Sequence, residues 1–265
     1  MQPLSTYPRA MLEALGEIAG FCLRVMGLVF SGRVFQFSGE ALRQAGILIL
    51  GSAIVIWGLV FITGLTCGIE GAYLLRAQGA PSYAGVFAAW CDLREIVPYA
   101  FGYMMAAKVG TGIVAELGAM RISDEIDALE VMGVPPVTFL AATRLLAAWI
   151  VLPLIYLGAV GVAFFASWIA VVEQVGDVSS GGYFLIFWLF QIPPDLAFSL
   201  IKGMTMATAI VLVGCYYGYT ARGGPVGVGT ATAKSMFLNI VLVHIIGMLG
   251  TLVFWGANPR APIGG

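Results

Sequence analysis

Long uncharged apolar runs alternate with short charged segments along this chain. Residues 45–69, 145–172 and 235–257 each contain no Asp, Glu, Lys or Arg. A helix needs about 20 mainly apolar residues to cross the hydrocarbon core of a bilayer. The three runs therefore predict three membrane-spanning helices.

Two further runs are apolar but interrupted. Residues 83–113 contain four charged residues, yet Gly102, Ala106 and Gly110 recur every four positions. Small residues at this spacing let helices approach closely inside a membrane, so we count this run as the second span. Residues 183–219 form the fourth span in chain order, and Pro193-Pro194 should kink it or break its start.

The N-terminal segment has a different pattern. Its polar and small residues recur every three or four positions between residues 10 and 30, at Glu13, Gly16, Glu17, Gly20, Arg24 and Gly27. This narrow polar stripe predicts a helix that lies in the membrane interface instead of crossing it. Residues 31–43 should follow as a polar linker. We therefore divide the chain into an N-terminal segment (1–44) and a membrane domain (45–265).

A charged island, residues 116–133, separates the second run from the third. Ser123 can cap a helix, Gly133 can end it, and Pro135-Pro136 should stop it from continuing. The predicted helix runs from residue 123 to residue 132, which is too short and too charged to cross a bilayer. Apolar and acidic side chains would occupy different sides: Ile122, Ile126 and Leu129 on one, Asp124, Asp127 and Glu130 on the other. The helix either connects two spans along the membrane surface or docks a partner.

Composition supports a membrane protein. Of the 265 residues, 60% are hydrophobic and only 10% are charged, which one soluble core cannot accommodate. The pattern predicts an all-α integral membrane protein with an interfacial N-terminal helix, five spans and the island between the second and third. A net charge of -1 without a basic cluster argues against nucleic acid as a partner. Four scattered cysteines and a single histidine predict no metal site.

The arginines and lysines outside the spans predict the orientation. Most lie in the N-terminal segment, the island and the loop at Arg222, which five alternating spans place on one side. Arg76 and Arg260 fall on the other side. The N-terminus and the island should therefore be cytoplasmic and the C-terminus extracytoplasmic.

Residues 227–235 end like a nucleotide-binding loop, but Val228 and Ala233 stand where that loop needs glycine. No phosphate cradle is predicted, and the dinucleotide fingerprint also fails because Thr232 replaces its third glycine.

The island resembles the MlaE/YrbE family of permease subunits of MCE-associated ABC lipid transporters. Its pattern Ala-Glu-Leu-Gly-x-Met-Arg-Ile-Ser-x-Glu-Ile-Asp-Ala-Leu-Glu-x-Met-Gly matches residues 115–133 at nearly every position. Two more family patterns match. Arg-Glu-x-x-Pro matches Arg94, Glu95 and Pro98. A C-terminal glycine block matches Cys215, Gly218, Gly223, Gly224, Gly227, Val228, Gly229, Ala231 and Thr232. The chain departs from the family at Lys108, usually arginine, and at Thr143, usually proline. It resembles the actinobacterial Mce-operon permeases more than the proteobacterial ones.

The resemblance implies that residues 116–133 form the coupling helix that contacts a cytosolic ABC ATPase, through Glu116, Arg121, Asp124, Glu125, Asp127 and Glu130. It also implies a second permease subunit, identical or paralogous, MCE-domain partners, and a lipid or fatty acid as cargo. The chain itself would have no active site, cofactor or metal, because ATP and Mg would bind the ATPase. Its expected location is the cell membrane.

Ionisable residues within the spans are costly in hydrocarbon and often functional. Arg94 either neutralises Asp92 or Glu95 and pins helices together, or lines a cavity; Lys108 lies further along the same span. Asp195 and Lys202 share a face of the fourth span and predict a similar polar patch.

Two other functions remain open. One is a proton-coupled secondary transporter of a hydrophobic solute, which would use Glu95, Asp195 or His244. The other is an intramembrane enzyme with Asp92 and Asp195 as a carboxylate pair, although the sequence signatures of intramembrane aspartyl proteases are absent around both residues.

Overall fold

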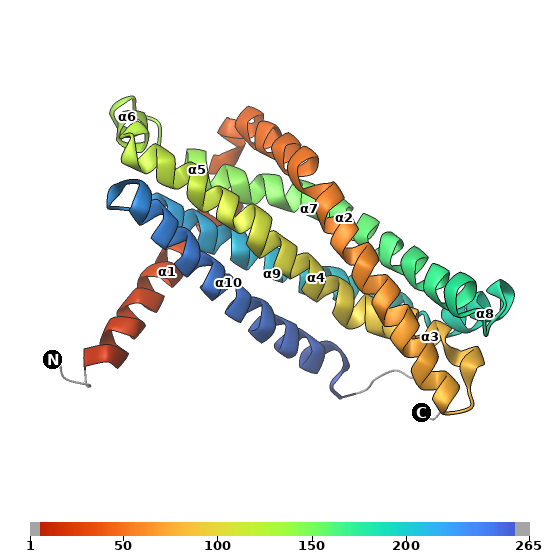
Figure 1. Ribbon diagram of the computed structural model, residues 1–265. Helices are drawn as coiled ribbons and strands as arrows, with labels where there is room; N and C mark the ends of the chain where they lie inside the picture. Colours follow the sequence, from red (N-terminus) through yellow and green to blue (C-terminus); the bar gives the residue numbers. More distant parts are fainter. Residues whose placement is uncertain (1–5, 258–265) are drawn as a thin grey trace. The chain divides into compact units, whose positions relative to one another are not determined.

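The computed structural model describes residues 6–257, and no strand occurs among them. The first helices are α1 (Thr6–Phe30), the 3-10 helix η1 (Arg33–Phe37) and α2 (Ser38–Ala77), followed by a 3-10 turn, η2 (Pro81–Tyr83). Figure 1 shows how helices follow one another along the chain. The prediction of an all-α membrane protein is confirmed.

The second predicted span is one continuous helical run with two π-helical segments. It consists of α3 (Gly85–Phe87), the π-helix η3 (Ala88–Ile96), α4 (Val97–Met104), the π-helix η4 (Met105–Gly110) and α5 (Thr111–Ile122). The short helix α6 (Glu125–Val131) follows after a two-residue turn.

The remaining helices are mostly long. They are the π-helix η5 (Val137–Ala142), α7 (Thr143–Trp168), the π-helix η6 (Ile169–Val175), α8 (Ser180–Phe190), α9 (Pro193–Tyr219) and α10 (Gly224–Trp255). The helix α6 already ends at Val131, four residues before Pro135, so the prolines do not end it, and Pro136 directly precedes η5 as its N-terminal flanking residue.

Four helical segments within residues 6–257 are long and apolar enough to cross a membrane, namely Arg33–Ala77, Val137–Val175, Pro193–Tyr219 and Gly224–Trp255. They contain or overlap the first, third, fourth and fifth predicted spans. The second predicted run is helical but is not among them, because its charged residues lower its hydropathy. That this run crosses the membrane stays a prediction.

One expectation about boundaries was wrong and another was confirmed. The predicted linker at 31–43 is largely helical, because α2 begins at Ser38 and its first turns are stabilised by Glu40, which accepts hydrogen bonds from Arg43 (2.7 and 2.8 Å) and Gln44 (2.9 Å). The fourth run is two helices, α8 and α9, because Pro193 and Pro194 lack the N–H groups that would continue α8. The expected break at these prolines is confirmed.

The chain forms two compact units, and α2, α7, α9 and α10 contribute residues to both. The first unit comprises the residues up to Ile47 with Lys108–Trp149 and Thr208–Asn239. The second comprises Leu48–Ala107, Ile150–Ala207 and the residues from Ile240.

Small residues allow close helix contacts inside the second unit. A Cβ atom on Gly64 of α2 would lie 2.8 Å from the carbonyl oxygen of Ala163 on α7. The hydroxyl of Ser167, one turn further along α7, donates a hydrogen bond to the Gly64 carbonyl (3.0 Å). Gly102 of α4 likewise faces Met206 and Val243, 3.1 Å from its virtual Cβ. The small-residue ridges expected from the sequence therefore lie at helix contacts.

We predict that Gly64→Leu destabilises the protein, because the new side chain would collide with the backbone of α7. Overpacking of this kind costs about 1–3 kcal/mol, and thermal unfolding in detergent would measure it. Gly58→Leu is the matched control, since Gly58 lies on the same helix and has no atom within 4 Å of its virtual Cβ. Equal midpoints for the two variants would contradict the contact.

Candidate functional site

The α5–α6 turn is the first candidate site, and its geometry differs from the prediction. The helix α6 spans seven residues, fewer than the ten expected, and Ser123 does not cap it. The Ser123 hydroxyl instead donates toward the Ala119 carbonyl (3.0 Å) and Glu125 Oε1 (2.8 Å). Asp124 makes the turn with a left-handed backbone (φ 59°), which is uncommon for a residue other than glycine. Gly133 ends the helix at φ 76°, as expected.

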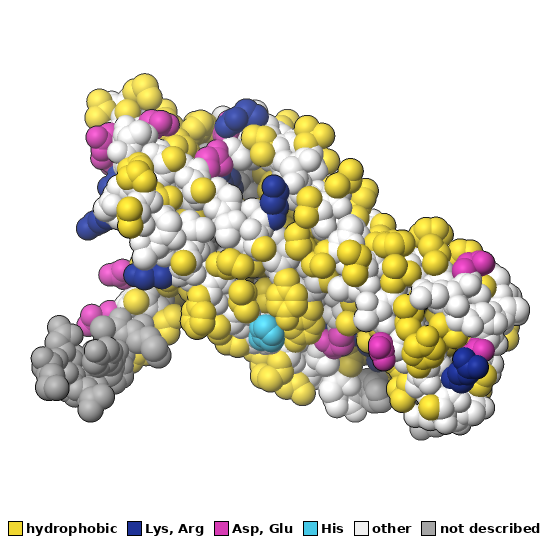
Figure 2. Space-filling view, viewed as in Figure 1, with side chains coloured by type: hydrophobic (Ala, Val, Ile, Leu, Met, Phe, Trp, Pro, Cys, Tyr) yellow, Lys and Arg dark blue, Asp and Glu magenta, His cyan; other side chains and the backbone are white. Residues whose placement is uncertain are grey.

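The apolar residues of this turn do not share one environment. Ile126 is buried within the first unit, whereas Val131 and Met132 are 90% and 69% exposed. The carboxylates of Asp124, Glu125, Asp127 and Glu130 lie on exposed residues. Figure 2 shows acidic and hydrophobic side chains together on the surface over α6. The exposed surface therefore combines negative charge with two apolar side chains at the end of α6.

Arg121 and Arg144 each form an ion pair with a carboxylate of the first unit. Arg121 donates to Asp127 (2.5 Å), which ties the end of α5 to α6. The buried Arg144 of α7 pairs with Glu116 of α5 (2.7 Å) and donates to the Leu140 carbonyl (2.8 Å). Glu116 thus joins α5 to α7 through this ion pair.

The predicted glycine block opens α10. Gly223 and Gly224 have φ of 89° and 67°, conformations that L-residues with side chains rarely adopt. A Cβ on Gly227 would lie 1.8 Å from the carbonyl oxygen of Arg222. These three glycines are therefore needed for a tight turn, whereas the virtual Cβ of Gly229 has no neighbour within 4 Å.

A buried ionic cluster in the second unit is the other candidate site. Arg94 of η3 donates from Nε (2.9 Å) and from a terminal nitrogen (2.6 Å) to one oxygen of Asp195 on α9. The other carboxylate oxygen accepts from the indole N–H of Trp255 (2.9 Å). The Arg94 guanidinium also lies 4.4 Å from the centre of the Trp90 ring, within cation–π range.

Lys202 completes the cluster and lies on the same helix as Asp195, about two turns further along α9. Its ammonium donates to Glu95 (2.8 Å), to the Arg94 carbonyl (2.9 Å) and to the Thr251 hydroxyl (2.8 Å). An ammonium has three N–H donors, and all three are used. Thr251 in turn donates to the second oxygen of Glu95 (2.7 Å).

The sequence predicted two separate polar patches, one at Arg94 and Glu95 and one at Asp195 and Lys202. In the structure they form a single cluster, and the ion pairs differ from those expected. Arg94 pairs with Asp195, not with Asp92 or Glu95 as expected. Asp92 is fully buried elsewhere and accepts a hydrogen bond from Ser167 (2.5 Å). Lys108 is exposed and belongs to the first unit, so it is not part of the cluster.

Sequence reasoning missed Trp90, Thr251 and Trp255. Thr251 and Trp255 are four residues apart and so share a face of α10, but nothing in that apolar run showed which helix they meet. Together with Arg94 and Glu95 they line a cavity of about 360 Å³. The rest of its lining is apolar and aromatic, apart from the Thr251 hydroxyl.

Four apolar helical segments, a charged turn and a buried ionic cluster together describe a polytopic membrane protein. A family model described as permease MlaE matches residues 41–253. The chain belongs to this family.

The identity to individual relatives is below 30% for the three proteins that follow. A probable ABC transporter permease protein of Rickettsia prowazekii is 29% identical over 61% of this chain and 62% of its own length. One of Synechocystis is 25% identical over 84% of this chain and 83% of its own. The intermembrane phospholipid transport system permease protein MlaE of Haemophilus influenzae is 24% identical, over 93% and 94%. The match thus spans less than two thirds of the Rickettsia relative.

We predict that Arg94→Leu strongly destabilises the second unit, because it leaves the buried Asp195 without its cation. Removing one partner of a buried pair costs on the order of 3–5 kcal/mol. Thermal unfolding and the yield of monodisperse protein in detergent would measure this.

The double variant Arg94→Leu/Asp195→Leu should recover a large part of the loss, because no uncompensated charge remains. Additive losses in the double variant would show that the two side chains act independently.

Proposed function

We propose that this chain is the transmembrane permease subunit of an ABC-type transporter that moves lipids or fatty acids between the cell membrane and an MCE protein assembly. A separate cytosolic ATPase would supply the energy and bind ATP and Mg. The observation that carries the proposal is the exposed surface of α6, which offers acidic and apolar contacts on a short helix between membrane segments. Family membership and the relatives' names support the same class.

In this proposal the α6 surface receives the motion of the ATPase and passes it to α5 and α7. Arg121 pairs α6 with α5, and Glu116 pairs α5 with the buried Arg144 of α7. Ile126 is buried below the exposed acids. A load that an ATPase applies to α6 would therefore pass into α5 and α7 through two ion pairs and one packed side chain.

The charged cavity of the second unit suits an amphipathic cargo. Trp90 and Phe87 offer apolar contact, while Arg94 and Glu95 offer charge. In this proposal the chain lies in the cell membrane with its N-terminus and α6 in the cytoplasm and its C-terminus outside. It works with a second permease subunit, identical or paralogous.

The test is charge reversal on α6. Glu125→Lys/Glu130→Lys leaves the Arg121–Asp127 pair intact and places like charges against a basic partner, which costs binding energy. We expect the variant to fold normally, to copurify much less ATPase and to lose lipid transport. Each single change should matter less, since exposed ion pairs contribute about 0–1 kcal/mol.

Glu70→Lys/Glu173→Lys is the matched control, because it makes the same change of net charge at two exposed acids of the second unit. It should keep wild-type ATPase stoichiometry. If Glu125→Lys/Glu130→Lys also keeps the ATPase and transports lipid, α6 is only a connector and the coupling role is wrong.

A further inference from the structure

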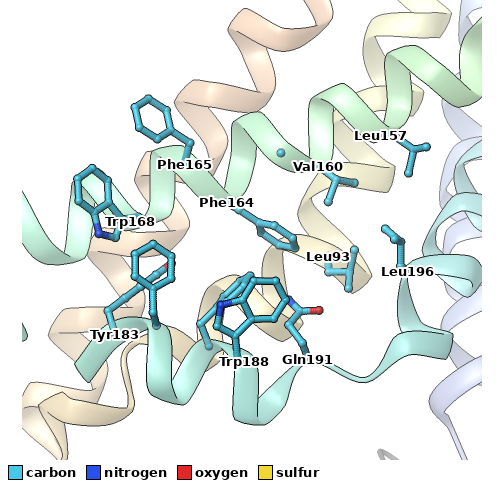
Figure 3. Close-up of a pocket in the computed structure, with 13 residues that line it drawn as sticks. Leu93, Leu157, Val160, Phe164, Phe165, Trp168, Tyr183, Trp188, Gln191 and Leu196 are labelled. Atoms are coloured by element: carbon cyan, nitrogen blue, oxygen red, sulfur yellow. The ribbon is translucent and has the colours of Figure 1, made fainter. Parts of the chain in front are cut away.

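A large apolar cavity in the second unit lies apart from the charged cluster. Its volume is about 670 Å³, and its walls come from α7, α8, η3 and the start of α9. Figure 3 shows Phe164 pointing from α7 toward Trp188 and Gln191, with Leu93 and Leu196 on the far side of the space. Leu93 lines this cavity, whereas its neighbours Arg94 and Glu95 line the charged one.

The walls are held in place independently of any occupant. Phe164 meets Phe187 edge to face (ring centroids 4.9 Å apart), and Phe187 meets Trp188 in the same way (5.1 Å). The helix α8 is anchored at its start by Trp168, whose indole donates to Ser180 (3.1 Å). At its end the indole of Trp90 donates to the Phe190 carbonyl (3.2 Å). The cavity is therefore preformed.

Hydrogen-bonding groups of the lining lie at both ends of α8, with the buried Tyr183 hydroxyl near its start and Gln191 at its end. The amide nitrogen of Gln191 is buried and has no hydrogen-bond partner among the described residues. A half-turn of the amide exchanges its nitrogen and oxygen, which lets Gln191 present either a donor or an acceptor. Trp188, three residues earlier, is 67% exposed and carries an indole N–H. Tryptophan is enriched at the level where lipid headgroups meet hydrocarbon.

We propose that this cavity holds an acyl chain of a membrane lipid within a single copy of the protein, with the lipid's ester group against Gln191 and Trp188. The volume lies within the range of roughly 300–1,000 Å³ that is usual for small-molecule sites. The cavity's almost wholly apolar lining with hydrogen-bonding groups at Gln191 and Trp188 matches an acyl chain joined to an ester. The site does not depend on ATP-driven transport.

The test uses the purified chain in lipid nanodiscs without any ATPase, and a phospholipid with a photoreactive diazirine in the middle of one acyl chain. After irradiation, peptide mass spectrometry should find adducts concentrated in residues 157–168 and 183–191. Excess unlabelled phospholipid should suppress them. Adducts spread evenly over the exposed faces of α2 and α10 would overturn the proposal.

A cavity-filling variant sharpens the test. Gly161 lines the cavity, and its virtual Cβ has no atom within 4 Å, so Gly161→Leu should fill the space without a collision. We expect adducts in the cavity peptides to fall about tenfold, because the new side chain occupies the space of the acyl chain. Gly58→Leu, an equally open glycine on α2, should leave them unchanged. Equal labelling in both variants would refute an occupant in this cavity.

The ester contact is tested with Gln191→Leu and a second probe, a photoreactive hydrocarbon without an ester. The wild-type protein should prefer the ester lipid over the hydrocarbon, and Gln191→Leu should lose this preference while still labelling with both probes. A preference unchanged by Gln191→Leu would overturn the ester assignment. Because ATPase binding plays no part in these measurements, their failure would leave the coupling proposal untouched, and the reverse also holds.

Discussion

The cost of a charge in hydrocarbon is the constraint on which the second unit depends. Asp195 and Lys202 lie on an otherwise apolar helix, and both are almost completely buried. Each would be expensive without a partner. Arg94 and Trp255 satisfy Asp195, and Glu95 and Thr251 satisfy Lys202. These partners lie on η3 and α10. The bonds that compensate the two charges of α9 therefore also hold η3, α9 and α10 together.

The π-helical geometry of η3 belongs to this arrangement. A π-helix widens the backbone by bonding residues five apart and is frequent at functional sites. Within η3, Trp90 stacks under the Arg94 guanidinium, the Arg94 carbonyl accepts from Lys202, and Glu95 reaches Thr251. Leu93 points into a different, apolar cavity. Three consecutive residues of η3 thus face two different cavities: Leu93 the apolar one, and Arg94 and Glu95 the charged one.

The sequence predicted what is encoded locally. Uncharged runs predicted the long helices, Pro193-Pro194 predicted the break before α9, and small residues predicted close contacts such as that of Gly102 with Met206 and Val243. It could not predict that Arg94 would select Asp195, 101 residues away, over the nearby Asp92 and Glu95, because pairing depends on which helix faces meet. Thr251 and Trp255 were hidden for the same reason. Ser123 misled because a serine before an acidic turn suggests a cap, whereas here its hydroxyl bonds backward to Ala119.

The two cavities of the second unit differ in how readily they can accept a ligand. In the charged cavity the polar groups already satisfy one another, so an incoming headgroup must compete with bonds such as Lys202 to Glu95. Such competition lowers the net binding free energy, because the gain from new contacts is offset by the loss of old ones. In the aromatic cavity no such bonds have to be broken, since its lining is almost wholly apolar and its shape is held by ring contacts. Tighter binding is therefore expected in the aromatic cavity than in the ionic one.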